Sequence, residues 1–145
     1  MAQPTTLSRE DLLARVALHD QWTNIDRADP GDRRQYVLIG HPRLGQEKPL
    51  DPMIAGDNGF CMTVVTASPG HGPRLHSHAE NETFMVLSGR WKFVVGEGDD
   101  QKTVELGKYD TISMPSFVPR TFINLEPGED GQQGEVLAIN LTDRP

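Results

Sequence analysis

Residues 70–89 read Gly-His-Gly-Pro-Arg-Leu-His-Ser-His-Ala-Glu-Asn-Glu-Thr-Phe-Met-Val-Leu-Ser-Gly. Arg74–His78 is predicted to be a strand, and side chains on a strand alternate between its two faces. His76 and His78 are therefore expected to point to the same side. The three residues that follow can turn the chain, so that Glu82 opens the returning strand close to both imidazoles.

This arrangement predicts a metal centre. Two neutral imidazoles and one carboxylate on one face can bind a divalent transition metal and leave positions open for substrate. Non-haem iron oxygenases use this ligand set, and Mn, Ni, Co or Zn also suit its chemistry. We predict that His76, His78 and Glu82 hold one divalent ion, with iron as the first expectation.

The rest of the chain alternates short apolar runs with turn residues, and its 14 glycines and 11 prolines favour many short strands over long helices. Strands at this spacing without intervening helices indicate an antiparallel sandwich or barrel. Phe84, Val86, Phe93 and Phe122 are expected in its core. The predicted strands are Tyr36–Ile39, Phe60–Ala67, Arg74–His78, Glu82–Leu87, Arg90–Val95, Thr103–Leu106, Thr111–Met114, Arg120–Asn124 and Glu135–Leu141.

A short N-terminal helix is predicted ahead of these strands. Ser8 has the character of an N-cap, and apolar residues then recur at helical spacing until about Asp20 or Gln21. Leu12, Leu13 and Val16 are expected to pack on the barrel or on a second subunit. We therefore divide the single domain into an N-terminal helix and extended arm, residues 1–59, and a barrel, residues 60–145.

Composition narrows the function classes. The chain has 145 residues, with 14 Lys and Arg against 21 Asp and Glu, for a net charge of −7. Such an acidic surface disfavours binding to nucleic acid or to an anionic membrane. The N-terminus lacks the basic and apolar stretches of a signal peptide, which predicts a cytoplasmic location. The single cysteine, Cys61, excludes an internal disulfide, and we expect it to be a small buried side chain.

The stretch from residue 70 to residue 89 resembles the first motif of the cupin superfamily. That motif is Gly, five residues, His-x-His, three or four residues, Glu, six residues and Gly. Gly70, His76, His78, Glu82 and Gly89 match all its fixed positions. The resemblance extends over roughly residues 60–141. It implies an all-β fold, an antiparallel double-stranded β-helix or jelly-roll barrel, with the site inside.

The second cupin motif is degenerate in this chain. Asp110, Pro115 and Asn124 keep their places, whereas Tyr109 and Phe117 replace two glycines. Because a bulky residue disfavours positive φ, we expect a different backbone at Phe117. Arg120 stands where the family has its fourth metal ligand, a histidine.

Arg120 leaves two interpretations open. A guanidinium stays protonated and has no lone pair to donate, so Arg120 is not a metal ligand. In the first interpretation it is a catalytic-site residue that grips an anionic substrate beside the metal. In the second it forms a buried pair with Glu82, and the metal is weak or absent.

Three functions fit this reading. The first is a metal-dependent enzyme, dioxygenase-like, that cleaves a small and acidic organic substrate with Arg120 orienting the acidic group. The second is a non-catalytic small-molecule-binding or sensing cupin. The third is metal-assisted isomerase or lyase chemistry on a sugar-like acid. The resemblance also suggests a homodimer.

Overall fold

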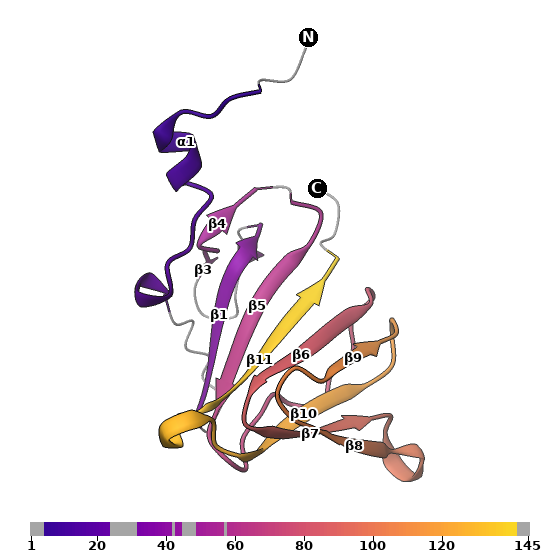
Figure 1. Ribbon diagram of the computed structural model, residues 1–145. Coiled ribbons are helices and arrows are strands. Elements are labelled where there is room, and N and C mark those ends of the chain that lie inside the picture. Colours follow the sequence, from indigo (N-terminus) through magenta and orange to yellow (C-terminus); the bar gives the residue numbers. More distant parts are fainter. Residues whose placement is uncertain (1–4, 24–31, 42, 45–48, 57, 142–145) are drawn as a thin grey trace.

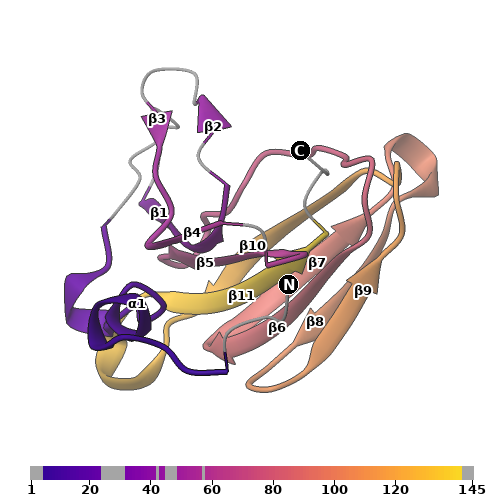
Figure 2. The same cartoon turned by 90° about the horizontal axis from the view of Figure 1, so that it is seen from above.

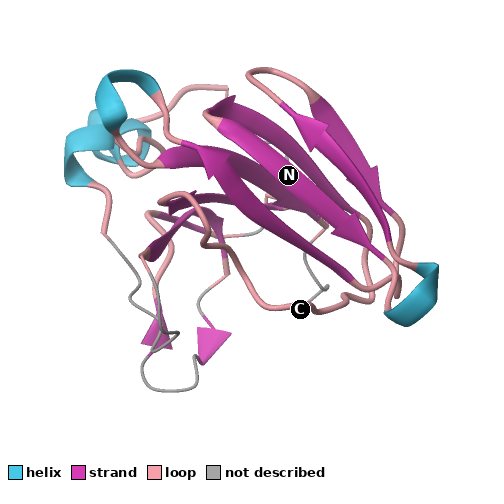
Figure 3. Ribbon diagram, turned by 90° about the horizontal axis from the view of Figure 1, so that it is seen from below, coloured by secondary structure: helices cyan, strands magenta, loops and turns pink. Residues whose placement is uncertain are grey.

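The computed structural model describes residues 5–23, 32–41, 43–44, 49–56 and 58–141 (Figure 1). The described part is built mainly from strands, with short helical pieces at the periphery (Figure 3). The helical pieces are α1 (Arg9–Leu13), η1 (His19–Gln21), η2 (Gly98–Asp100) and η3 (Glu129–Gly131). The strands are β1 (Arg33–Gly40), β2 (Arg43–Leu44), β3 (Pro49–Leu50), β4 (Ile54–Ala55), β5 (Cys61–Ala67), β6 (Glu82–Ser88), β7 (Arg90–Val95), β8 (Lys102–Leu106), β9 (Thr111–Met114), β10 (Arg120–Glu126) and β11 (Gly134–Asn140).

The strands form two main sheets. The larger has the order β4-β1-β5-β11-β6-β9, and the smaller has the order β10-β7-β8. Every pairing in them is antiparallel except that of β4 with β1. The smaller sheet faces the larger one, with the core between them (Figures 1 and 2). The predicted antiparallel jelly roll is confirmed, whereas the boundary between residues 59 and 60 stays a prediction.

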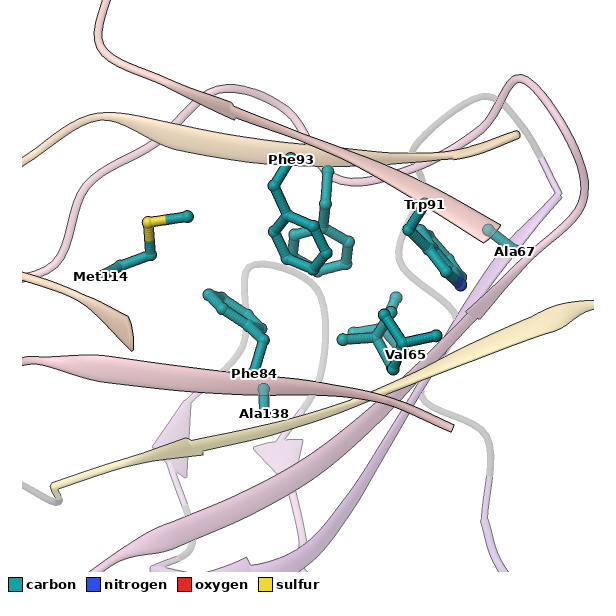
Figure 4. Close-up of a cluster of buried hydrophobic side chains, with 10 residues drawn as sticks. Val65, Ala67, Phe84, Trp91, Phe93, Met114 and Ala138 are labelled. Carbon is teal, nitrogen blue, oxygen red and sulfur yellow. The ribbon is translucent and has the colours of Figure 1, made fainter. Parts of the chain in front are cut away.

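The core is an aromatic cluster held between the two sheets. Phe122 on β10 contacts Phe84 on β6 and Phe93 on β7, with ring centroids 5.0 and 5.3 Å apart. Trp91 stacks its edge on the same ring at 5.7 Å. Figure 4 shows Phe84 and Phe93 pointing toward each other from facing strands. All four rings are buried, as predicted for the three phenylalanines, and Cys61 is also buried.

The segment that carries both histidines does not form the strand predicted at Arg74–His78, and that prediction is wrong. The segment makes one isolated antiparallel bridge, in which His76 and Arg120 exchange backbone hydrogen bonds of 3.0 and 2.7 Å. Pro73 has no N–H to donate, and Gly72 adds no side chain to a ladder, so regular pairing is interrupted just before the bridge. His76 is therefore placed by this backbone pair with β10, and the Asn124 N–H donates a further 3.0 Å hydrogen bond to the carbonyl of His71.

The N-terminal helix is shorter than predicted. Its cap is confirmed, because the Ser8 hydroxyl accepts a 3.0 Å hydrogen bond from the Asp11 N–H. The helix ends at Leu13, however, rather than near residue 20, and none of its residues is buried. A helix this short depends on tertiary packing for stability, and α1 lies at the margin of the molecule beside β4 (Figure 1). Leu12 and Leu13 are about half exposed, so the expected packing on the barrel is not seen.

The different backbone expected at Phe117 is also absent. Phe117 has φ +66° and Tyr109 has φ +70°, so both keep the left-handed conformation that favours glycine. For a residue with a Cβ this conformation costs about 1–2 kcal/mol. The Phe117 N–H donates a 2.6 Å hydrogen bond to the carbonyl of His78. That bond holds the strained loop against the histidine segment.

Gly72 is expected to be the least tolerant glycine in this segment. A Cβ there would lie 1.8 Å from the Phe122 carbonyl oxygen on β10, whereas a Cβ on Gly98 would meet nothing within 4 Å. We expect Gly72→Ala to lower the free energy of unfolding by about 3 kcal/mol, since overpacking against a backbone cannot relax cheaply. Gly98→Ala, with φ +59°, should cost only the strain of about 1 kcal/mol. Urea denaturation compares the two variants, and equal losses would contradict the close approach.

Candidate metal centre

The backbone bridge fixes how His76 lies. In an antiparallel pair, directly opposed residues place their side chains on the same face. His76 and Arg120 therefore project to one side of β10. His76 Nδ1 contacts the Arg74 carbonyl, which can only accept a hydrogen bond, so Nδ1 carries the proton. In its neutral form the ring then carries its lone pair on Nε2, the atom with which such a histidine binds a metal.

Glu82 reaches the same place from the larger sheet. It is the first residue of β6, and the burial alternates along this strand so that Glu82, Phe84 and Val86 all face the core. On its two sides it pairs with Asn140 of β11 and Met114 of β9. The strand period that buries the aromatic ring of Phe84 thus also buries a carboxylate.

Burial changes the chemistry of this carboxylate. It raises the pKa of Glu82 from its ordinary value of 4.5 to about 7, because a charge is less stable out of water. The positive charge of Arg120 opposes that rise, and the negative charge of Glu80 adds to it. Glu82 Oε1 lies buried without a hydrogen-bond partner. The site therefore holds an oxygen acceptor that nothing in the described part of the chain satisfies.

The structure brings the three predicted ligands together. One ligand atom from each of His76, His78 and Glu82 lies within 4.8 Å of the others. The two imidazole centroids are 4.9 Å apart, and His78 Nε2 lies 3.8 Å from Glu82 Oε1. This donor set fits a divalent transition metal. The Arg74 carbonyl fixes the tautomer of His76, and Glu82 Oε1 has no hydrogen-bond partner among the described residues. The remaining histidines in the described residues, His19, His41 and His71, lie outside this cluster.

Arg120 is fully buried at the start of β10 and shares a face with Phe122 and Asn124. Its Nη2 donates a 2.7 Å hydrogen bond to the carbonyl of Pro115, whereas Nε and Nη1 have no partner in the part of the chain that the structure describes. Within the described residues it makes no ion pair with Glu82 inside 4.0 Å. Burial lowers the pKa of Arg120, and the charge of Glu82 opposes that effect. The charges of Arg120 and Glu82 therefore interact electrostatically at a distance longer than that of an ion pair.

Sequence reasoning missed three supports of this site. The Pro115 carbonyl anchors Arg120, the Arg74 carbonyl orients His76, and the Asn81 side chain accepts a 3.0 Å hydrogen bond from the Ser116 N–H. Two of these are backbone carbonyls, which carry no sequence signal. Asn81 had none for this contact either, because a turn asparagine predicts a bond to neighbouring backbone and Ser116 lies 35 residues away.

Comparison with known proteins agrees with this fold. Residues 63–131 match a family model described as a cupin domain. No curated protein matches the sequence. Within the described residues, no helix has both the length and the apolar character needed to cross a bilayer.

Several solved structures share the fold at low sequence identity. KdgF from Halomonas sp. superimposes with a TM-score of 0.61 and 16% identity, over 88% of this chain and 94% of that one. The polyketide cyclase RemF from Streptomyces resistomycificus gives 0.65 and 21%, over 90% and 80%. The iron(II) form of HppE gives 0.60 and 17%, over 87% and 59%. At these identities the likeness establishes the fold alone.

Removing either imidazole should abolish metal binding. We expect His76→Ala and His78→Ala to weaken binding of a divalent ion by more than about 100-fold, since even changes outside the ligand set cost 10–100-fold. His71→Ala is the matched control, because His71 lies in the same segment but outside the cluster. Elemental analysis after purification and titration with Mn(II) measure the effect. Unchanged metal content in both ligand variants would refute the assignment.

The buried carboxylate should make the metal-free protein less stable as pH rises. A folded pKa of about 7 against an ordinary 4.5 means that the protonated form is favoured by folding. That stabilisation is complete below pH 4.5 and is lost as the pH rises through about 7. Each pKa unit corresponds to about 1.4 kcal/mol, so the free energy of unfolding falls by about 3 kcal/mol over this range.

Urea denaturation of metal-free protein from about pH 5 to about pH 8 measures this loss. We expect Glu82→Gln to remove it, whereas Glu105→Gln, at an exposed residue of β8, should follow the wild type. A saturating divalent ion should also flatten the profile, since coordination uses the charged carboxylate. A wild type and a Glu82→Gln variant with parallel profiles would contradict the prediction.

Proposed function

Because this chain belongs to the cupin superfamily, we propose that it is a metal-dependent enzyme acting on a small organic substrate that carries an acidic group. The observation that supports this proposal most directly is the cluster of His76, His78 and Glu82. Three ligands on one side of an ion leave its other positions free for a substrate. A closed structural site would instead need a fourth protein ligand, and the residue at that place is Arg120.

The proposed reaction is oxygen-dependent bond cleavage with iron as the metal. A divalent iron held by this ligand set would supply Lewis acidity and redox chemistry with dioxygen. The iron(II) protein of similar fold supports this choice of metal. Mn, Ni, Co and Zn remain compatible with two imidazoles and a carboxylate.

The chain's own residues have distinct parts in this proposal. The Arg74 carbonyl keeps the His76 ring in one tautomer and one orientation, so that Nε2 stays available. Glu82 supplies the single negative charge of the ligand set. Arg120 orients the acidic group of the substrate through Nε or Nη1, neither of which has an acceptor among the described residues. The aromatic core beneath Glu82 excludes water from that side of the site.

A homodimer, a cytoplasmic location and the absence of nucleic-acid or membrane partners stay predictions. The exposed leucines of α1 are available for contact with a second subunit, as the sequence suggested.

Oxygen uptake by iron-loaded protein tests the reaction. We expect wild type loaded with Fe(II) to consume oxygen with at least one member of a panel of small carboxylic acids, and not with the matching amides. His76→Ala should abolish uptake, and Arg120→Lys should raise the KM by roughly 10-fold, since it loses the guanidinium's hydrogen-bonding geometry.

Other outcomes would identify a different function. An acid transformed without oxygen uptake would indicate isomerase or lyase chemistry and contradict the oxygen-dependent step. Acids that bind to the metal-loaded protein without being transformed would indicate a non-catalytic binding protein. His71→Ala provides the control for general damage to this segment.

A further inference from the structure

Arg120 is a buried cation with unused hydrogen-bonding capacity. None of its surface is exposed, and of its three guanidinium nitrogens only Nη2 has an acceptor among the described residues. Leaving buried donors unpaired costs more than an average hydrogen bond contributes, and a buried charge costs more still unless it is neutralised. The unpaired donors and the positive charge of Arg120 fit an oxygen-bearing anion.

The neighbouring charges are few. The backbone bridge places Arg120 on the same face as His76, and the negative charge it senses is that of Glu82. Glu82 is also the only acidic member of the metal cluster. A divalent ion and the guanidinium, with three positive charges between them, would therefore share the one carboxylate of the cluster, and Glu80 adds a negative charge nearby.

We propose that Arg120 makes metal binding and carboxylate binding mutually dependent, so that this site takes a divalent ion and a carboxylate together more tightly than either alone. This inference rests on the proposed function, because it requires the metal centre. It adds to that function how the site takes its ligands: Arg120 repels the bare ion, and a carboxylate that accepts a hydrogen bond from Nε or Nη1 supplies the negative charge that attracts the ion.

The coupling is reciprocal. A carboxylate that raises the affinity for the metal must gain the same factor from the metal, since both belong to one thermodynamic cycle. Couplings between sites commonly amount to 5–150-fold, and those between desolvated charges are strong because little water screens them. We expect a change on the order of 10-fold. The consequence is that the ion is held firmly only while a carboxylate is present.

Titration with Mn(II) tests this coupling without any assay of activity. The dissociation constant is measured from the signal of free Mn(II) in electron paramagnetic resonance, with sodium propionate or with propionamide and sodium chloride at equal ionic strength. Protein-free blanks correct for the weak complex of Mn(II) with propionate. We expect propionate to lower the dissociation constant of the wild type on the order of 10-fold and propionamide to leave it unchanged.

Variants assign the effect to Arg120. Arg120→Met removes the charge at similar side-chain length, so Mn(II) should bind more tightly without acid and propionate should no longer matter. Arg120→Gln serves the same purpose if the first variant does not fold. Arg90→Met is the matched control, because Arg90 forms its 3.3 Å ion pair with Glu105 on β8 and should keep the wild-type coupling.

The possible failures are distinguishable. A wild-type dissociation constant indifferent to propionate overturns the coupling and leaves the metal centre standing. Coupling that persists in Arg120→Met also overturns it, since the acid then acts through the metal alone. Absence of Mn(II) binding in both solutions overturns the metal centre together with the coupling.

Discussion

The backbone pair between His76 and Arg120 is the constraint on which this site depends. The segment before β6 contains two prolines and two glycines and forms no ladder of its own, so its orientation at His76 depends on this pair. Two hydrogen bonds place an imidazole and a guanidinium side by side on one face. The Phe117 N–H then ties the carbonyl of His78 to the loop that precedes β10. Hydrogen bonds to β10 and to the loop before it thus give the irregular segment before β6 a defined conformation.

The same alternation that builds the core also creates the electrostatics of the site. β6 and β10 each begin with a charged residue and continue with buried aromatic residues on the same face. Glu82 and Arg120 are therefore buried because of their positions in the strands, although charged side chains favour water. Loss of water raises the pKa of Glu82 and lowers that of Arg120. Their separation leaves acceptor and donor atoms unsatisfied on both. Residues that a stable core would exclude therefore lie together at the candidate site, which is where shifted pKa values commonly occur.

The regular parts of the molecule could be predicted from sequence, because alternation and turn residues carry a strong local signal. The strands at Arg90–Val95 and Thr111–Met114 begin and end where the sequence predicts. The grouping of the ligands could be predicted too, although their predicted strand is wrong. The length of α1 could not, since a helix without a buried face ends early. Nor could the backbone at Phe117, where a hydrogen bond to a distant carbonyl outweighs the preference of an aromatic residue.

Strand β8 is expected to open locally more often than the rest of the barrel. It is an edge strand that pairs only with β7, and Val104, opposite the buried ring of Phe93, is still 41% exposed. Few buried contacts and an open row of backbone groups mark a region that opens locally before the molecule unfolds. Amide hydrogens of β8 should exchange with solvent far sooner than those of β6, which lies between β11 and β9. Local opening of β8 would therefore leave β6, the strand that carries Glu82, paired with both of its neighbours.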